Sequence, residues 1–125
     1  MKRFGVFRAI LLMGGLATGL LSGCQDKPVE PSAQDLQRAE QARPGDARLA
    51  AIYDRSCVTC HGTRSAAPLA GFEPAWRPRL KQGMDVLLQH ARDGFNGMPA
   101  KGLCTDCTDD DLRALIAFMS SSHDH

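Results

Sequence analysis

Aromatic residues are scarce in this chain: among 125 residues there are five phenylalanines, one tyrosine and one tryptophan, too few for a large aromatic core. An excess of one charge sign is also missing, because 15 lysines and arginines face 14 aspartates and glutamates, for a net charge of +1. A protein that bound nucleic acid mainly through its charge would need a marked basic excess. We therefore expect one small domain with appendages and no nucleic-acid partner.

A hydrophobic run long enough to cross a membrane is missing as well. The apolar stretch at residues 9–21 has 13 residues, whereas a spanning helix needs about 20. Because a basic N-terminus precedes it, we interpret residues 1–23 as a secretory signal. The stretch ends in Leu-Leu-Ser-Gly-Cys, which resembles the lipobox of bacterial lipoproteins. The resemblance implies lipidation of Cys24 in the mature protein; the alternative is an ordinary signal peptide with Cys24 merely nearby.

Removal of residues 1–23 changes the charge and the compartment. The remaining chain has 12 basic and 14 acidic residues, a net charge of −2. Its destination is the oxidising periplasm, where disulfides persist. Gln25 and Asp26, the second and third mature residues, favour the outer membrane slightly over the inner one. Residues 24–46 are expected to form a lipidated N-terminus and flexible tether of roughly 25 Å; a polar helix capped by Ser32 and packed on the domain is the alternative.

Three segments of a domain at residues 47–122 have apolar residues at helical spacing, and none alternates convincingly like a strand. Asp46 can cap the first segment, Gly94 follows the second, and Thr108 with Asp111 forms a capping box before the third. The proline-rich stretch 62–82 is expected to be mainly loop, and residues 123–125 a disordered tail. The apolar positions are Leu49, Ile52 and Tyr53; Met84, Leu87, Leu88 and Ala91; and Leu112, Leu115, Ile116 and Met119.

Cys57-Val58-Thr59-Cys60-His61 is a CxxCH sequence, the attachment signature of c-type haem. Two thiols one helical turn apart can form thioethers with the two vinyl groups, and the histidine that follows can then bind the iron. The alternative is a zinc site that joins this pair to Cys104 and Cys107. The gap of 43 residues between the pairs is far beyond the usual spacing of about 15–20 and weighs against it.

A second axial ligand must come from elsewhere in the chain. Met98 is the best candidate, because it lies in a glycine-rich loop and a thioether is a soft ligand for iron. Two other methionines lie on helical stripes and are expected in the core, and His90 is expected at the surface. The rivals are Met84, Met119, His90, His123 and His125.

These features together resemble the class I c-type cytochromes, and most closely the short bacterial cytochrome c5 group. The resemblance covers about residues 47–121 and includes the CxxCH, Ala67-Pro68, Ala75-Trp76 and the run from Gly94 to the second CxxC; Ala100 replaces the family's usual proline. It implies an all-α fold of three to four helices around one covalent haem c. It also implies that the carbonyl of Pro68 accepts from His61, that Trp76 packs near a haem propionate, and that Cys104 and Cys107 form a disulfide.

The expected function is that of a carrier of single electrons rather than an enzyme, because His61 and Met98 would fill both axial positions. The carrier would lie in the periplasm, anchored to the membrane through Cys24. Its expected partners are an upstream cytochrome or quinol-oxidising complex and a terminal oxidase or reductase. A haem-based ligand sensor, or an accessory electron-entry subunit of a periplasmic oxidoreductase, is the alternative.

Overall fold

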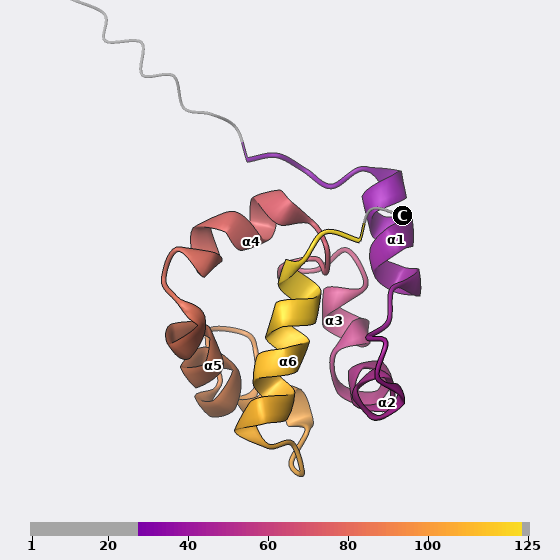
Figure 1. The fold of residues 1–125 in the computed structure, drawn as a ribbon. Coiled ribbons are helices and arrows are strands. Elements are labelled where there is room, and N and C mark those ends of the chain that lie inside the picture. The colour runs from indigo at the N-terminus through magenta and orange to yellow at the C-terminus, as the bar shows by residue number, and fades with distance from the viewer. Residues whose placement is uncertain (1–27, 124–125) are drawn as a thin grey trace, which may run out of the picture.

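The computed structural model describes residues 28–123, and over this range it confirms the predicted all-α architecture (Figure 1). No strand occurs within it; there is one isolated bridge, between Phe95 and Met98. No helix in this part of the chain is long and apolar enough to cross a membrane. The elements are α1 (Ala33–Gln41), α2 (Ala47–Ser56), α3 (Val58–His61), α4 (Glu73–Leu80), α5 (Met84–Asp93), the 3-10 turn η1 (Ala100–Leu103) and α6 (Asp109–Ser120).

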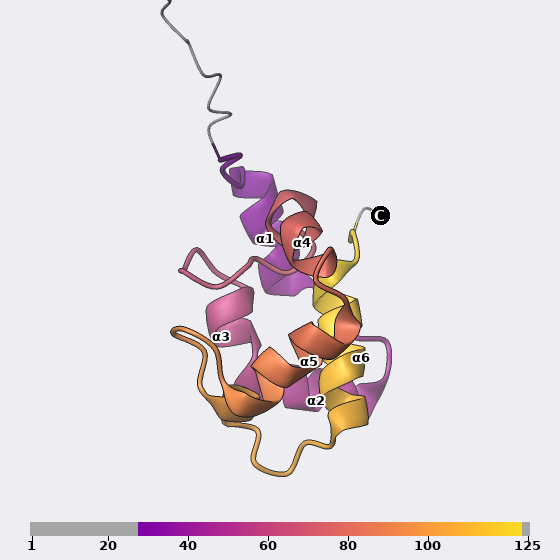
Figure 2. The same cartoon turned by 90° about the vertical axis from the view of Figure 1, so that its left-hand side faces the viewer.

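Helix α6 lies in the middle of the molecule, between α5 on one side and α2 with α3 on the other (Figure 1). Helix α4 crosses one end and contacts both α5 and α6. The turned view places α3 and the loop after α5 at the same edge of the molecule (Figure 2). This arrangement brings the CxxCH and the Met98 loop, about 40 residues apart in sequence, to one region of the fold.

The three predicted helices form as expected, because their apolar stripes meet in one core. Asp46 caps α2 by accepting from the Leu49 N–H at 2.8 Å, and Thr108 and Asp111 form the predicted capping box of α6. Gly94 ends α5 with a φ of 87°, a left-handed conformation that favours glycine. The buried stripe residues are Ile52, Tyr53, Leu87, Leu88, Ala91, Leu112, Leu115, Ile116 and Met119, with Leu49 and Met84 packed partly against them.

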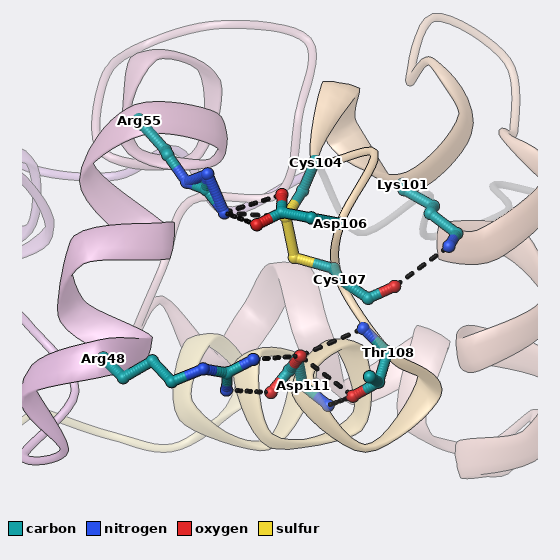
Figure 3. The surroundings of a disulfide bond; sticks show 8 residues. All are labelled: Arg48, Arg55, Lys101, Cys104, Asp106, Cys107, Thr108 and Asp111. Atoms are coloured by element: carbon teal, nitrogen blue, oxygen red, sulfur yellow. Dashed lines mark hydrogen bonds and ion pairs between the residues drawn. A yellow bond between two sulfur atoms is a disulfide. The ribbon is translucent and has the colours of Figure 1, made fainter.

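A buried carboxylate joins α2 to α6 (Figure 3). The side chain of Asp111 is only 8% exposed and accepts two hydrogen bonds from the Arg48 guanidinium, at 2.5 and 2.9 Å. The same carboxylate accepts from the Thr108 N–H and hydroxyl. The Arg48 guanidinium and the Thr108 donors hold the pKa of Asp111 well below its ordinary value. The charged form of Asp111 therefore stabilises the crossing of the two helices.

The expectation of a loop over 62–82 is wrong for residues 73–80, which form α4. Pro74 lies in the first turn, where its missing N–H costs no helical hydrogen bond. Trp76 then anchors the helix, because its side chain is buried and its indole N–H donates to the Leu69 carbonyl at 2.8 Å. Pro78, near the end of α4, lacks the N–H for one helical hydrogen bond. The burial of Trp76 and its bond to Leu69 offset that loss.

Within the segment expected to be a flexible tether, residues 24–46, residues 33–41 instead form helix α1. Ser32 and Asp35 form a complete capping box, and Ala39 is fully buried against the domain. The alternative of a packed helix therefore describes the structure, because even a mostly polar helix can pack through two residues, here Leu36 and Ala39. Residues 1–27, with the expected signal and Cys24, lie outside the described residues.

His123, expected in a disordered tail, packs against the domain. Its ring lies 4.6 Å from that of Phe118 and covers Gly71, where a Cβ would approach the imidazole to 2.5 Å. The positive φ of Gly71, 74°, is a second reason for glycine there. His125 lies outside the described residues.

Cys104 and Cys107 form a disulfide just before α6, with Cα atoms 5.4 Å apart. Figure 3 shows that its surroundings connect three parts of the chain. Arg55 of α2 donates to the Asp106 carboxylate at 2.9 and 3.0 Å, and the Lys101 ammonium donates to the Cys107 carbonyl at 2.9 Å. The disulfide thus ties the loop after the Met98 turn to both α2 and α6.

Replacing Asp111 by asparagine should remove part of the acid sensitivity of folding. A depressed pKa stabilises the fold above the unfolded-state pKa of about 4, and this contribution is lost as the pH falls toward the folded-state value. Asp111→Asn should therefore be less stable than the wild type at pH 7, and the gap should narrow below about pH 4. Urea unfolding followed by circular dichroism at several pH values measures this, with exposed Asp110→Asn as the matched control. A gap that does not depend on pH would contradict the assignment.

Replacing both Cys104 and Cys107 by serine should lower the free energy of unfolding by about 2 kcal/mol, the chain-entropy value for so short a loop. Denaturant unfolding of the two proteins under non-reducing conditions tests this. Thr105→Ala, a change at an exposed position inside the same loop, is the control and should leave the midpoint nearly unchanged. Equal stability of the double variant and the wild type would show that the disulfide does not stabilise this loop.

Candidate functional site

The CxxCH sequence occupies the junction between α2 and α3. The Cys57 N–H closes the last turn of α2 on the Tyr53 carbonyl at 2.9 Å, and the Cys57 carbonyl accepts from the His61 N–H at 2.9 Å. The thiol of Cys57 is half-buried and that of Cys60 is exposed, and both are free. Burial raises the pKa of the Cys57 thiol to about 11. A sulfur in such surroundings is better suited to a neutral thioether than to a metal-bound thiolate.

His61 is buried and its ring orientation is fixed by one hydrogen bond. Nδ1 lies 2.8 Å from the Pro68 carbonyl oxygen, so Nδ1 carries the proton and Nε2 keeps its lone pair. Burial is the main cause that lowers the pKa of His61, and the nearby positive charge of Arg79 lowers it further, while the Pro68 carbonyl opposes the shift. The side chain is therefore a neutral imidazole at pH 7, the form that binds a metal through nitrogen.

Trp76 lies beside the histidine and shields it. The two rings stack with centroids 6.2 Å apart and an angle of 28° between their planes. Because the indole N–H is already bonded to the Leu69 carbonyl, Trp76 has no donor left for a propionate and acts through packing. Of the neighbouring basic residues, exposed Arg77 pairs with Glu73, whereas Arg79 donates to the Ala75 carbonyl and lies close enough to lower the pKa of His61.

Met98 lies in a turn that the backbone closes on itself. The Phe95 and Met98 peptide groups exchange two hydrogen bonds, at 3.0 and 2.9 Å. Gly94 opens the turn, and a Cβ on it would lie 3.1 Å from the Met98 carbonyl. The Met98 side chain is half-buried and packs against the core. A Cβ on Gly102 would lie 3.3 Å from the Ser56 carbonyl and 3.7 Å from Met98 Cε, so the methionine lies near the residue that precedes the CxxCH.

The rival ligands lie in other surroundings. Met119 is buried in the core and Met84 packs partly against it, as expected. The ring of His90 stacks on Phe95 with centroids 3.8 Å apart, so it is half-buried rather than at the surface and supports the Met98 turn from outside. His123 packs on Phe118. Met98 is thus the candidate whose loop reaches the CxxCH junction.

Tyr53 is a residue of the site that the sequence indicated only as core. Its side chain is fully buried, and its hydroxyl has no hydrogen-bond partner among the described residues. Burial, with the nearby Cys57 as the second cause, raises the pKa of Tyr53 to about 12. A buried hydroxyl beside Cys57 with its hydrogen bond unmade is costly. A polar group held at the CxxCH, such as a haem substituent, would remove that cost.

The chemistry of the donor set fits haem c and does not fit a four-cysteine zinc site. Cys104 and Cys107 are bonded to each other, so their sulfurs cannot serve as thiolate ligands beside Cys57 and Cys60. The residues that remain are two free thiols one turn apart, a neutral imidazole and a half-buried thioether. A covalently attached haem would use all four, the two cysteines for thioether attachment and the histidine and methionine as iron ligands.

Known proteins are similar to this chain in sequence. The family described as cytochrome c oxidase, cbb3-type, subunit III matches residues 44–119. Cytochrome c5 of Azotobacter vinelandii is 45% identical over 82 residues, which cover 63% of this chain and 94% of that protein. Cytochrome c-555 of Chlorobaculum tepidum is 42% identical over 74 residues, or 55% of this chain and 68% of that protein.

A solved structure extends the likeness to the fold. It is described as the electron transfer complex of nitrite reductase with cytochrome c, and the matching chain is 37% identical, with a TM-score of 0.52 over 60% of this chain and 93% of that one. The cofactor is accordingly a covalently attached haem c. The chain belongs to the family described as cytochrome c oxidase, cbb3-type, subunit III, and is a class I c-type cytochrome.

Proposed function

We propose that this cytochrome is a lipid-anchored periplasmic carrier in which Cys57 and Cys60 attach the haem and His61 and Met98 are its axial ligands. The observation that carries the proposal is the pairing of a buried, oriented imidazole with a methionine turn whose backbone is closed by two hydrogen bonds. When bound, the haem supplies an iron that alternates between the ferric and ferrous states. The chain's task is to bind that group, fix its ligands and exclude water.

The protein side chains determine what the site can do. A histidine and a methionine that fill both axial positions leave no coordination site for a substrate, which favours electron transfer over catalysis. Methionine ligation raises the reduction potential relative to two histidines, and this suits delivery of electrons to a terminal reductase or oxidase. The cytochrome c of the structural relative is in an electron transfer complex with nitrite reductase. We take a reductase or oxidase of that kind as the acceptor, and an upstream cytochrome or quinol-oxidising complex as the donor.

The proposed anchor rests on the sequence of residues 1–24. An acyl chain on Cys24 would confine the carrier near membrane-bound partners and raise its effective concentration there. The capping residue Ser32 follows Cys24 by eight positions, so the domain would sit closer to the lipid surface than a free tether of the whole 24–46 segment allows. We assign the outer membrane from Gln25 and Asp26.

Met98→Ala should lower the reduction potential and open the sixth position. Loss of the thioether should change the potential by on the order of 0.1 V, within the roughly 0.8 V range that axial ligands set. The weak far-red band of methionine-bound ferric haem should disappear, and carbon monoxide should bind the ferrous form. Optical spectra and a redox titration measure these, with Met84→Ala as the control that keeps the band.

An unchanged far-red band in Met98→Ala would move the axial ligand to another residue. Rapid binding of carbon monoxide or cyanide by the wild type would instead favour the ligand-sensor alternative.

Cys24→Ser should move the protein from the membrane to the soluble periplasmic fraction without changing its haem content. The serine cannot form the thioether with diacylglycerol that lipidation requires. Separation of inner and outer membranes by density, followed by haem staining, measures both the anchoring and the membrane chosen. Ser22→Ala keeps a small residue before the cysteine and should remain membrane-bound. Membrane retention of the Cys24→Ser protein would show that the anchor is not a lipid on this residue.

A further inference from the structure

We propose that residues 30–43, here called the N-terminal strap, are a positioning element for His61. The strap holds the loop of residues 62–68 in place, and that loop carries the Pro68 carbonyl that orients the imidazole. The inference rests on the proposed role of His61 as an axial ligand. It concerns residues that precede the family match, which begins at residue 44.

The strap contacts the first residue of the loop directly. Ala39 of α1 is 0% exposed, and its carbonyl oxygen lies 3.3 Å from the position that a Cβ on Gly62 would occupy. The helix backbone therefore lies against the residue that follows His61. Gly62 is buried and has no room for a side chain, because a Cβ would also approach Val58 to 2.6 Å. Leu36, one turn earlier, packs against the core.

A second contact holds the loop further along. The Arg64 guanidinium donates to the Pro31 carbonyl at 3.2 Å and lies 3.5 Å from the Glu30 carboxylate. At the far end of the strap, the guanidinium of Arg43 lies 5.5 Å from the centre of the Tyr53 ring and pairs with Asp54. The strap is thus fastened to α2 at one end and to the loop at the other.

The loop has little other support on its outer side. Residues 63–66 are exposed, and a cleft of about 430 Å³ separates the loop from the residues before α1. Leu36, Arg64 and Pro68 all line this cleft. Thr63 and Ser65 bond within the loop and to α3, through the carbonyls of Thr59 and Cys60. The strap's two contacts are those that oppose movement of the loop toward the cleft. The Ala70 N–H closes the inner side by donating to the His61 carbonyl at 2.8 Å.

The consequence for the site follows from the hydrogen bond at Pro68. A group that accepts the Nδ1 proton fixes the ring of a metal-bound histidine and strengthens its donation to the metal. If the loop moves outward, the 2.8 Å bond between Nδ1 and the Pro68 oxygen lengthens and opens more often. The Nδ1 proton then exchanges faster with water, while attachment through Cys57 and Cys60 is unaffected.

Two neutral substitutions on α1 make a matched test in the full-length holoprotein. Ala39→Gln places a larger side chain where there is no room and should lift the helix from Gly62; Ala33→Gln makes the same change at an exposed position of the same helix. Neither alters the charge, so electrostatics cannot shift the readout. Nuclear magnetic resonance of the ferrous protein measures exchange of the His61 Nδ1 proton. We expect at least tenfold faster exchange in Ala39→Gln and the wild-type rate in Ala33→Gln, with a reduction potential that shifts only in the former.

Arg64→Gln is a second variant that does not disturb the core, and it decides the question if Ala39→Gln fails to fold. It should also accelerate exchange, by less than Ala39→Gln, because one of the two contacts remains. If the His61 Nδ1 proton exchanges at the wild-type rate in Arg64→Gln and in any folded Ala39→Gln, the strap does not position His61. If the wild-type protein lacks the far-red methionine band, the proposed ligand set is wrong instead. The two failures are therefore distinguishable.

Discussion

The hydrogen bond between His61 and the Pro68 carbonyl is the interaction on which the rest of this structure depends. It joins the last residue of α3 to a loop that has no secondary structure of its own, and it decides which ring nitrogen is left to bind a metal. Three further contacts support this hydrogen bond. Trp76 stacks on the imidazole, its own N–H holds the neighbouring Leu69 carbonyl, and α1 lies against Gly62. The helices are needed to place these few groups around one ring.

The Met98 turn, on the opposite side of the site, is held in a different way. Apart from the His90 ring of α5, which stacks on Phe95, the Met98 turn depends on backbone pairing with Phe95, on a glycine at each end, and on the disulfide that precedes α6. A small domain has too little core to stabilise such a loop by burial alone. The backbone hydrogen bonds, the glycines and the disulfide therefore stabilise this loop where burial cannot. They make the chain rigid at Met98, the proposed ligand.

Much of this could be predicted from the sequence, for physical reasons. Helices α2, α5 and α6 carry apolar stripes, and each has its predicted cap, at Asp46, Gly94 and Thr108 respectively. Periodicity detects such helices well. The CxxCH is informative because its chemistry is local: five consecutive residues contain both attachment points and one ligand. The resemblance to the cytochrome c5 group supplied the Pro68 acceptor and the disulfide, which periodicity cannot reveal.

The parts that could not be predicted depend on contacts between distant residues. Helix α4 contains two prolines, so its sequence predicts a loop. Nothing in that sequence shows that the Trp76 indole N–H donates to the Leu69 carbonyl and holds the helix in place. The sequence of α1 predicts a polar tether, since one buried alanine and one partly buried leucine form no clear apolar stripe. The unmade hydrogen bond of Tyr53 was equally hidden, because a tyrosine on an apolar stripe looks like core until its hydroxyl is located.

The unequal surroundings of the four cysteines at residues 57, 60, 104 and 107 have a consequence for assembly. A chain with two CxxC pairs in an oxidising compartment risks exchanging partners between them. Thiol–disulfide exchange proceeds through the thiolate, and a Cys57 pKa of about 11 leaves little thiolate at neutral pH. The Cys104–Cys107 pair is buried beneath Arg55 and Asp106, which restricts attack from outside. Once the domain has folded, burial of the Cys104–Cys107 pair therefore slows its exchange with the two thiols of the CxxCH.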